Sequence, residues 1–398
     1  MLLFLISQAW CEKSYLTISK VKVFLDDVEL TEDNEGEIKK TTILSYTNFK
    51  EGKSLSESAI NHEVTESKLR LMDSGLFYTA EVEAVKSRIN PDAVIIVISV
   101  RKGFLMRFGG GAIYGLFGRV SLGGNRNKLL GYAGYNKSGV SYIDENVCGI
   151  PLVLGAAAFT NLPEAFAGKK NYKLESDVKA GFYITPDLYI GEDTGFFFDF
   201  GNKDELNNSF DLLLSPYVFL KHYYSERLFN TAEVRSFNNP LKNTHAFEAA
   251  YTINFVLTKR INLAGLVSGG FVKDTKINLD KDSLPFYEQP GLSNRGIRSG
   301  YSKEDLLTDT YCLCTFETRF RAANVSIPPC LPCEIVPYLF ADVAFAHNYD
   351  SDDADLLDAF GAGVQLNLDS PVFAYFNFSY GVNHFGKGKF TFTAMQSF

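Results

Sequence analysis

The sequence predicts a small α+β domain followed by a 16-stranded antiparallel transmembrane β-barrel. Three observations lead to this fold class. Residues 15–102 follow the pattern β-α-α-β-β. From residue 103 to the end, apolar and polar residues alternate in one segment after another, as they do along β-strands. Two of these segments carry apolar side chains on one face and charges of both signs on the other, which suits a barrel with lipid outside.

The length and the net charge of the chain limit the classes of protein to which it can belong. The chain has 398 residues and a net charge of −8, so we expect one large or two moderate domains. An acidic chain is not expected to bind nucleic acid through a basic surface. The sequence contains no run of 18 apolar residues that would predict a transmembrane helix, but barrel strands need only about ten residues of alternating pattern. We divide the chain into residues 1–14, 15–102 and 103–398.

Residues 1–14 begin with the apolar run MLLFLISQAW. Ser7-Gln8-Ala9, with a small residue at each end, is typical of the stretch before a cleavage site, but the positive segment that begins a secretory signal is missing. Three interpretations stay open: the remnant of a signal or leader, a mistaken start, and part of the first strand of the mature protein.

Residues 15–102 form the predicted α+β domain. Gly75 follows the second helix, where glycine adopts positive φ at low cost and ends the helix. Phe77 comes directly after it and is expected to fill the gap between helix and sheet. The predicted elements are strands at residues 15–25, 79–85 and 93–100, and helices at residues 35–46 and 56–74.

Residues 104–398 form the predicted barrel. Sixteen strands over this range give each strand with its turn about 18 residues, which suits membrane strands of about 9–11 residues. The clearest alternation lies near the end, at residues 360–368, 376–382 and 389–398. Soluble β-sandwiches also alternate, but here the pattern continues to the final residue, which favours a barrel.

Two strands in the carboxyl-terminal part carry the charges. In residues 310–321, Glu317 and Arg319 oppose the face that holds Cys312, Cys314 and Phe316. In residues 334–346, Asp342 opposes a face of Leu, Ala, Val and Phe side chains. Each strand therefore offers one acidic residue to the predicted interior.

A loop before these strands contains Arg295 and Gly296. This pair, followed by two alternating strands with one inward acid each, resembles the lumen-loop motif of the outer-membrane β-barrel assembly superfamily. The usual motif is an aliphatic residue, Arg, Gly and an aromatic residue; here Asn294 and Ile297 stand at the flanking positions. The superfamily includes bacterial BamA, the two-partner-secretion transporters and the mitochondrial sorting-and-assembly barrel subunit.

The resemblance implies a structural latch. In the superfamily the loop folds into the lumen, and its arginine contacts acidic groups on the next two strands. Carried over to this chain, Arg295 would contact Glu317 and Asp342. Because a buried charge without a partner is costly, the loss of Arg295 would destabilise the loop.

The first domain resembles a polypeptide-transport-associated (POTRA) domain. The segment from Leu69 to Val82 (LRLMDSGLFYTAEV), with Gly75 and Phe77, is similar to that domain's strongest motif. The chain has room for one such domain, so the closest resemblance is to the mitochondrial sorting-and-assembly barrel subunits, which carry a single POTRA domain.

The junction of the first and last barrel strands is the expected lateral seam. Gly109, Gly110 and Gly111 lie in the first strand, and glycine weakens strand pairing. The last strand carries Phe392 and ends at Phe398. A weak seam can open and expose a strand edge, which is a template for another strand.

The six cysteines include Cys330 and Cys333 in the segment IPPCLPC. This pair has no second pair at zinc-ligand spacing, so we expect a tight turn with a possible disulfide. Free cysteines at positions 312 and 314 on the lipid face would be awkward in an oxidising envelope. They favour the outer membrane of a mitochondrion or a related organelle over that of a bacterium.

These features predict a core insertase for β-barrel proteins, which templates client strands at the seam. The alternative is a polypeptide transporter like those of two-partner secretion, although these usually have two POTRA domains and a plug helix. The sequence shows no nucleophile elbow, catalytic triad or metal-ligand spacing, so we expect no enzyme activity, cofactor or metal. The expected partners are unfolded barrel clients, accessory assembly subunits and the lipid bilayer, with no nucleic acid.

Overall fold

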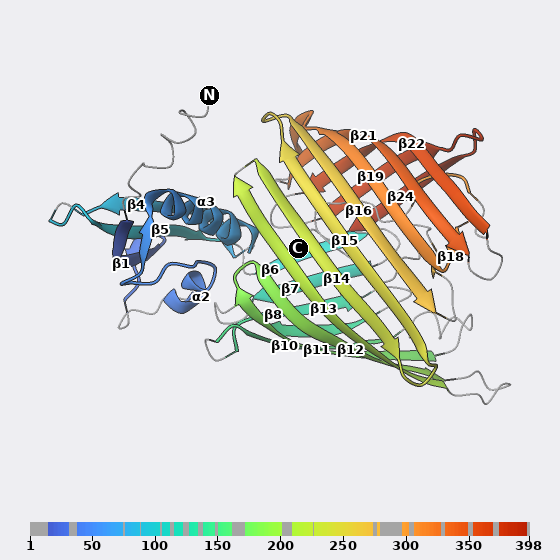
Figure 1. Cartoon of the computed structure of the whole chain (residues 1–398), viewed down its shortest axis with the longest axis horizontal. Helices are drawn as coiled ribbons and strands as arrows, with labels where there is room; N and C mark the ends of the chain where they lie inside the picture. Colours follow the sequence, from blue (N-terminus) through green and yellow to red (C-terminus); the bar gives the residue numbers. More distant parts are fainter. Residues whose placement is uncertain are drawn as a thin grey trace, which may run out of the picture. The chain divides into compact units, whose positions relative to one another are not determined.

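The chain divides into two compact units, which Figure 1 shows in a computed structural model. The first comprises Met1–Gly103 and Tyr223–Glu226, and the second comprises Phe104–His222 and Arg227–Phe398. The structure describes residues 15–395 except 32–37, 75, 88, 104–105, 112–114, 122–126, 134–137, 148–149, 161–171, 201–208, 226, 274–276, 279–296, 302–305, 328–330, 349–352 and 369–373. The predicted leader, residues 1–14, lies outside this part.

The first unit is a sheet with two helices. Its sheet has the order β2-β1-β5-β4, in which β1 runs parallel to β5, and β4 antiparallel to β5. The predicted order of strands and helices is present, with the short strands β2 and β3 added. The elements are β1 (Tyr15–Leu25), β2 (Val28–Glu29), α2 (Lys40–Leu44), β3 (Ser54–Ser56), α3 (Glu57–Asp73), β4 (Phe77–Lys86) and β5 (Ala93–Lys102).

One apolar core holds this unit together. Alternate residues of β1 and β5 are buried, as the two-residue period of a strand requires. Phe77 belongs to this core together with Leu76, and Gly75 before them lies outside the described residues. Helix α3 begins at the capping residue Ser56, whose side chain accepts a hydrogen bond from the Ala59 amide at 3.3 Å.

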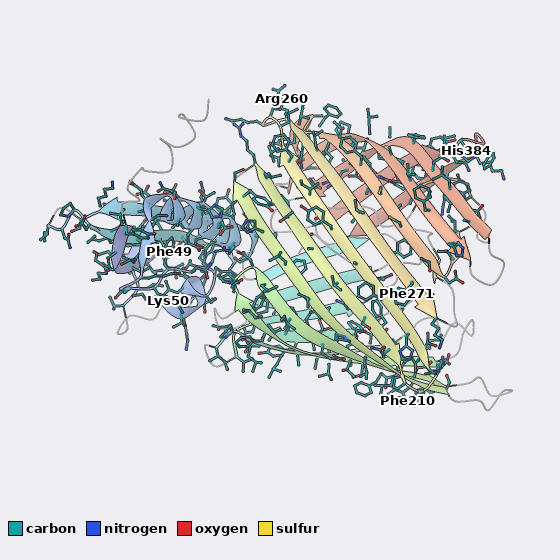
Figure 2. The ribbon with its side chains drawn as sticks, viewed as in Figure 1. Phe49, Lys50, Phe210, Arg260, Phe271 and His384 are labelled. Atoms are coloured by element: carbon teal, nitrogen blue, oxygen red, sulfur yellow. The ribbon has the colours of Figure 1, made fainter. Side chains whose placement is uncertain are left out.

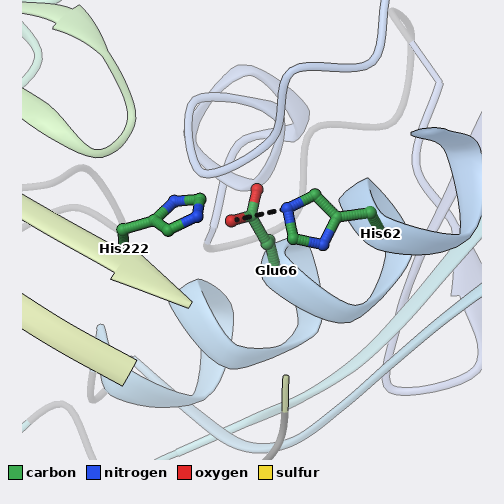
Figure 3. A group of neighbouring side chains, drawn as sticks. All are labelled: His62, Glu66 and His222. Atoms are coloured by element: carbon green, nitrogen blue, oxygen red, sulfur yellow. Dashed lines mark ion pairs between the residues drawn. The ribbon is translucent and has the colours of Figure 1, made fainter. Parts of the chain in front are cut away.

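A buried ion network ties α3 to the segment before it. Arg70 forms ion pairs of 2.8 Å with both Glu63 and Glu66, and Glu63 accepts hydrogen bonds from the amide and side chain of Asn48. Burial raises the pKa of Glu63, but Arg70 and the hydrogen bonds outweigh it, so the pKa lies below its ordinary value. His62 pairs with Glu66 one turn along the helix, at 3.3 Å (Figure 3).

The second unit is a large antiparallel sheet whose strand order closes on itself as a barrel, with β24 next to β6. Successive strands pair with one another, as in a meander. The strands are β6 (Met106–Gly111), β7 (Gly115–Ser121), β8 (Asn127–Ala133), β9 (Ser138–Asp144), β10 (Leu152–Thr160), β11 (Tyr172–Thr185), β12 (Leu188–Phe200), β13 (Ser209–Ser225), β14 (Leu228–Asn239), β15 (Thr244–Val256), β16 (Ile261–Lys273), β19 (Thr310–Phe320), β20 (Ala323–Ile327), β21 (Leu331–Asn348), β22 (Asp353–Leu368), β23 (Ala374–Val382) and β24 (Gly388–Met395).

Strands β19 and β20 form one run along the same partner. Both pair with β21, first from Thr310↔His347 to Arg319↔Tyr338 and then from Ala323↔Ile335. Between these two pairs, three residues on the β19–β20 side (320–322) oppose two on β21 (336–337). One extra residue on one side is a β-bulge, which bends a strand without ending its pairing.

Strand length changes around the barrel. In their described bounds, β6 to β9 contain only six or seven residues each. Strands β11, β13 and β21 contain 14, 17 and 18 residues. Figure 1 shows the same contrast between the cyan and green β6–β8 and the yellow β14–β15. Within the described residues, the first strands of the barrel are therefore shorter than these later ones.

The barrel strands expose apolar side chains and bury polar ones. On β21, Leu339 and Phe345 are exposed, whereas Asp342 between them is 0% exposed. Strand β16 follows the same rule: Val267 and Phe271 are exposed and Ser268 is buried, and Figure 2 labels Phe271 on this strand. Water-soluble sheets bury the apolar face, so this inversion indicates an outer surface that faces lipid.

Candidate functional site on the inner wall

The two inward acids lie on neighbouring strands. Asp342 of β21 is opposite Thr315 of β19, and Glu317 follows two residues later on the same face. Both carboxylates are buried on the inner side of the wall. Two negative charges this close need cations nearby, because unpaired buried charge is costly.

Residues 297–301, which we call the inner segment, supply one cation. The segment belongs to the connection between β16 and β19, and Arg298 within it is 1% exposed. Its Nε and Nη2 donate to the two oxygens of Asp342 at 2.7 and 2.5 Å, and its Nη1 donates to Glu317 at 2.8 Å. The Arg298 amide also donates to Asp342, at 3.2 Å. A planar guanidinium suits such two-pronged binding of a carboxylate.

A second arginine completes the charge balance. Arg319 on β19 donates from Nε and Nη2 to the other oxygen of Glu317, at 2.8 and 2.7 Å. Glu317 thus bridges Arg298 and Arg319, and the group of four holds two positive and two negative charges. The charges of these four buried side chains therefore balance.

Apolar contacts hold the inner segment against the same strands. The Arg298 guanidinium lies 3.5 Å from the centre of the Phe340 ring, within the range of a cation–π contact. Ile297 belongs to an apolar cluster with Tyr338, Phe340 and Leu313 on the inner face. Charge pairing and apolar packing together fix the segment on the inner wall.

The predicted latch acids are in place, but the arginine between them is Arg298. Arg295 and Gly296 lie outside the described residues. The sequence contained a signal for Arg298: it follows the aliphatic Ile297 and precedes Gly300 and the aromatic Tyr301, with Ser299 as one inserted residue. The order of residue types in the usual motif therefore also occurs around Arg298, three residues after Arg295.

The predicted seam residues are placed only in part. Gly109, Gly110 and Gly111 lie in β6 and pair with Phe117, Leu116 and Gly115 of β7. On the other side, Phe392 lies in β24 opposite Phe378. Phe398 lies outside the described residues.

Only one residue of the possible Cys330–Cys333 disulfide lies in the part of the chain that the structure describes. Cys333 has a free, buried thiol and is the third residue of β21, while Cys330 lies outside the described residues. Cys312 and Cys314 are also free, and they are exposed on the outer face of β19.

The closed antiparallel sheet, the apolar outer face and the buried inner charges define a transmembrane β-barrel. None of the helices that the structure describes is long and apolar enough to cross a membrane.

Solved structures of other proteins resemble this fold. No family model and no curated protein matches the chain. CdiB from Acinetobacter baumannii aligns with a TM-score of 0.54 at 12% identity, over 97% of this chain and 74% of CdiB. CdiB from Escherichia coli aligns with a TM-score of 0.51 at 10% identity, over 95% and 75%. At these identities the likeness shows a shared fold.

A structure of BamA from Haemophilus ducreyi lacking POTRA domains 1–3 also aligns, with a TM-score of 0.43 at 15% identity, over 96% of this chain and 84% of that one. The predicted fold class is confirmed in its coarse form, as a large antiparallel barrel sheet like that of CdiB.

Proposed function

We propose that this protein is the core insertase of an outer-membrane β-barrel assembly machinery. It holds the end strands of incoming barrel proteins at the seam between β6 and β24 and performs no covalent chemistry. Its partners are unfolded barrel clients, accessory subunits and lipid. The first unit serves as a single POTRA domain, and its helix-to-strand junction at Leu76 and Phe77, both buried in the core, supports this assignment.

The barrel in this proposal has sixteen strands. The closed order contains seventeen labelled segments, of which β19 and β20 are two parts of one run along β21. Sixteen is even, so the first and last strands of a meander are antiparallel and able to pair. The seam is then an ordinary antiparallel junction, and a client strand can replace either partner.

The observation that carries the proposal is the shortness of the wall beside the seam. The described parts of β6 and β7, six and seven residues long, extend about 20–23 Å along the strand axis, less than the roughly 30 Å hydrocarbon core. A bilayer adapts to such a mismatch by thinning. A thinned bilayer and a short, glycine-containing β6 lower the cost of parting the seam and of passing a client strand into lipid.

The free cysteines support the organelle that the sequence favoured. Cys312 and Cys314 have free thiols that are exposed on the outer face of β19. Free thiols persist in compartments that are not oxidising. We therefore propose the outer membrane of a mitochondrion or a related organelle.

A disulfide lock across the seam tests the proposal. The six native cysteines are replaced by serine, one cysteine is placed at Gly110, and residues 389–393 of β24 are scanned for the partner that forms a disulfide on oxidation. The control lock joins Phe182→Cys on β11 to Ile190→Cys on β12, which are directly opposite each other and exposed. We expect the seam lock alone to stop client assembly, with recovery after reduction. Assembly that continues in the locked protein would refute templating at this seam.

A further inference from the structure

We propose that the inner segment has a second anchor, formed by Tyr301, Asp358 and His384, which ties it to the β23–β24 hairpin. Through this anchor the segment positions β24, the closing strand of the barrel. The inference deepens the proposed function, and its relevance to assembly rests on that function. The anchor itself involves only residues of this chain, so it can be tested without a client protein.

The first contact joins the inner segment to β22. The Tyr301 hydroxyl donates to Oδ1 of Asp358 at 2.8 Å and accepts from the Asp358 amide at 3.1 Å. Asp358 lies on β22 opposite Val343 of β21. One hydroxyl therefore uses its donor and an acceptor site on the same residue, which fixes the tyrosine side chain at this point of the wall.

The second contact passes from Asp358 to the hairpin. His384, in the turn between β23 and β24, lies with Nδ1 at 2.6 Å from the same Oδ1 of Asp358, and its amide donates to that oxygen at 3.3 Å. Figure 2 shows His384 at the end of the barrel strands. The Asp358 side chain is 15% exposed, so it is partly shielded from water. Asp358 thus connects the inner segment to the final hairpin.

Ring and backbone contacts strengthen the same connection. The Tyr301 ring lies edge-on to Phe385, with 6.4 Å between centroids, and the Gly300 amide donates to the Lys387 carbonyl at 3.4 Å. The Arg298 carbonyl passes so close to Gly381 of β23 that a Cβ there would collide with it. The segment therefore packs along the hairpin with both side chains and backbone.

Two anchors on different strands make the inner segment a brace. Arg298 holds one end to β19 and β21, and the Tyr301 contacts hold the other end to β22 and the β23–β24 turn. Strand β24 borders β6 across the seam. Release of the Tyr301 anchor would free the closing hairpin while the Arg298 anchor kept the segment on β19 and β21.

Hydrogen exchange of β24 amides in the purified full chain in lipid nanodiscs tests this brace. The variants are Tyr301→Phe, which keeps the ring against Phe385 but removes the hydroxyl, and His384→Leu, which removes the ring nitrogen. His384→Asn keeps a donor near the position of Nδ1 and should restore protection. Tyr142→Phe on β9 is the matched control for a lost hydroxyl.

We expect β24 amides to exchange about fivefold faster in Tyr301→Phe and His384→Leu, the size that loss of one hydrogen bond produces in an opening equilibrium. Exchange in β19 should stay unchanged, as should exchange in the control. Unchanged β24 exchange in both variants would overturn the brace. The hydrogen-exchange measurement needs no client. Client assembly that continues in the seam-locked protein, together with faster β24 exchange in the variants, would therefore refute the insertase and leave the brace standing.

Discussion

At the residue scale, the protein depends on ion pairs that are removed from water. Arg298 satisfies both carboxylates of the inner wall, and Arg319 satisfies the remaining oxygen of Glu317. Such clusters add little net stability when complete, because desolvation offsets the attraction. Their effect appears when one member is lost and its partners stay buried. The cluster therefore enforces one position of the inner segment.

We expect Arg298→Ala to destabilise the barrel by about 3–5 kcal/mol, because it leaves Asp342 and part of Glu317 as unpaired buried charges. Arg298→Lys should recover only part of this loss, since an ammonium cannot match the guanidinium's fork. Thermal unfolding of the purified protein in detergent measures both. Arg295→Ala, three residues away, is the matched control; equal destabilisation by the two alanine variants would contradict the assignment of the latch to Arg298.

At the element scale, each barrel strand has one face for lipid and one for the interior. Leu339 and Phe345 on β21 are exposed while Asp342 between them is buried. The two-residue period of a strand fixes this division along its whole length. A shift of the register by one residue would place Asp342 in lipid and Leu339 in the interior.

A charge on the outer face of β21 should therefore be costly. We expect Leu339→Arg to destabilise the protein by about 2–4 kcal/mol, the cost of an arginine near the middle of a bilayer on a barrel's lipid face. Leu241→Arg, in the turn after β14, is the control because it adds the same charge to an exposed site. Chemical unfolding in phospholipid vesicles compares the two. An equal, small effect of both would argue against lipid contact at Leu339.

The sequence predicted which face of each strand points inward better than it predicted which side chains contact each other. The alternation of residues 310–321 and 334–346 correctly assigned Glu317 and Asp342 to the interior, because period two is a local property. The latch arginine was harder, since Arg295 and Arg298 share one loop and loops carry no periodicity. Cys333 seemed to belong to a turn because prolines flank it, yet pairing with β20 and β22 carries it into β21.

At the scale of the whole molecule, the barrel is uneven around its circumference. Long strands and the ion cluster stabilise the side from β11 to β22, whereas short strands from β6 to β9 follow the seam. The inner segment connects the stable side to the closing hairpin through Tyr301 and Asp358. The junction of β24 with β6 joins segments that are far apart in the sequence, and alternation within one segment could not predict it. Such a barrel can open at the seam between β6 and β24 while its other strands stay paired.

Site-specific crosslinking to a client would test the central claim most directly. A cysteine at Gly110 is offered to the final strand of a barrel precursor that is arrested during import, with a cysteine at Val267 on the distant outer face of β16 as the control. We predict a crosslink from position 110 that depends on the precursor's final strand, and none from position 267. If position 110 gives no crosslink, while the purified protein conducts ions across planar bilayers and exports a partner polypeptide, the chain is a transporter and the insertase is refuted.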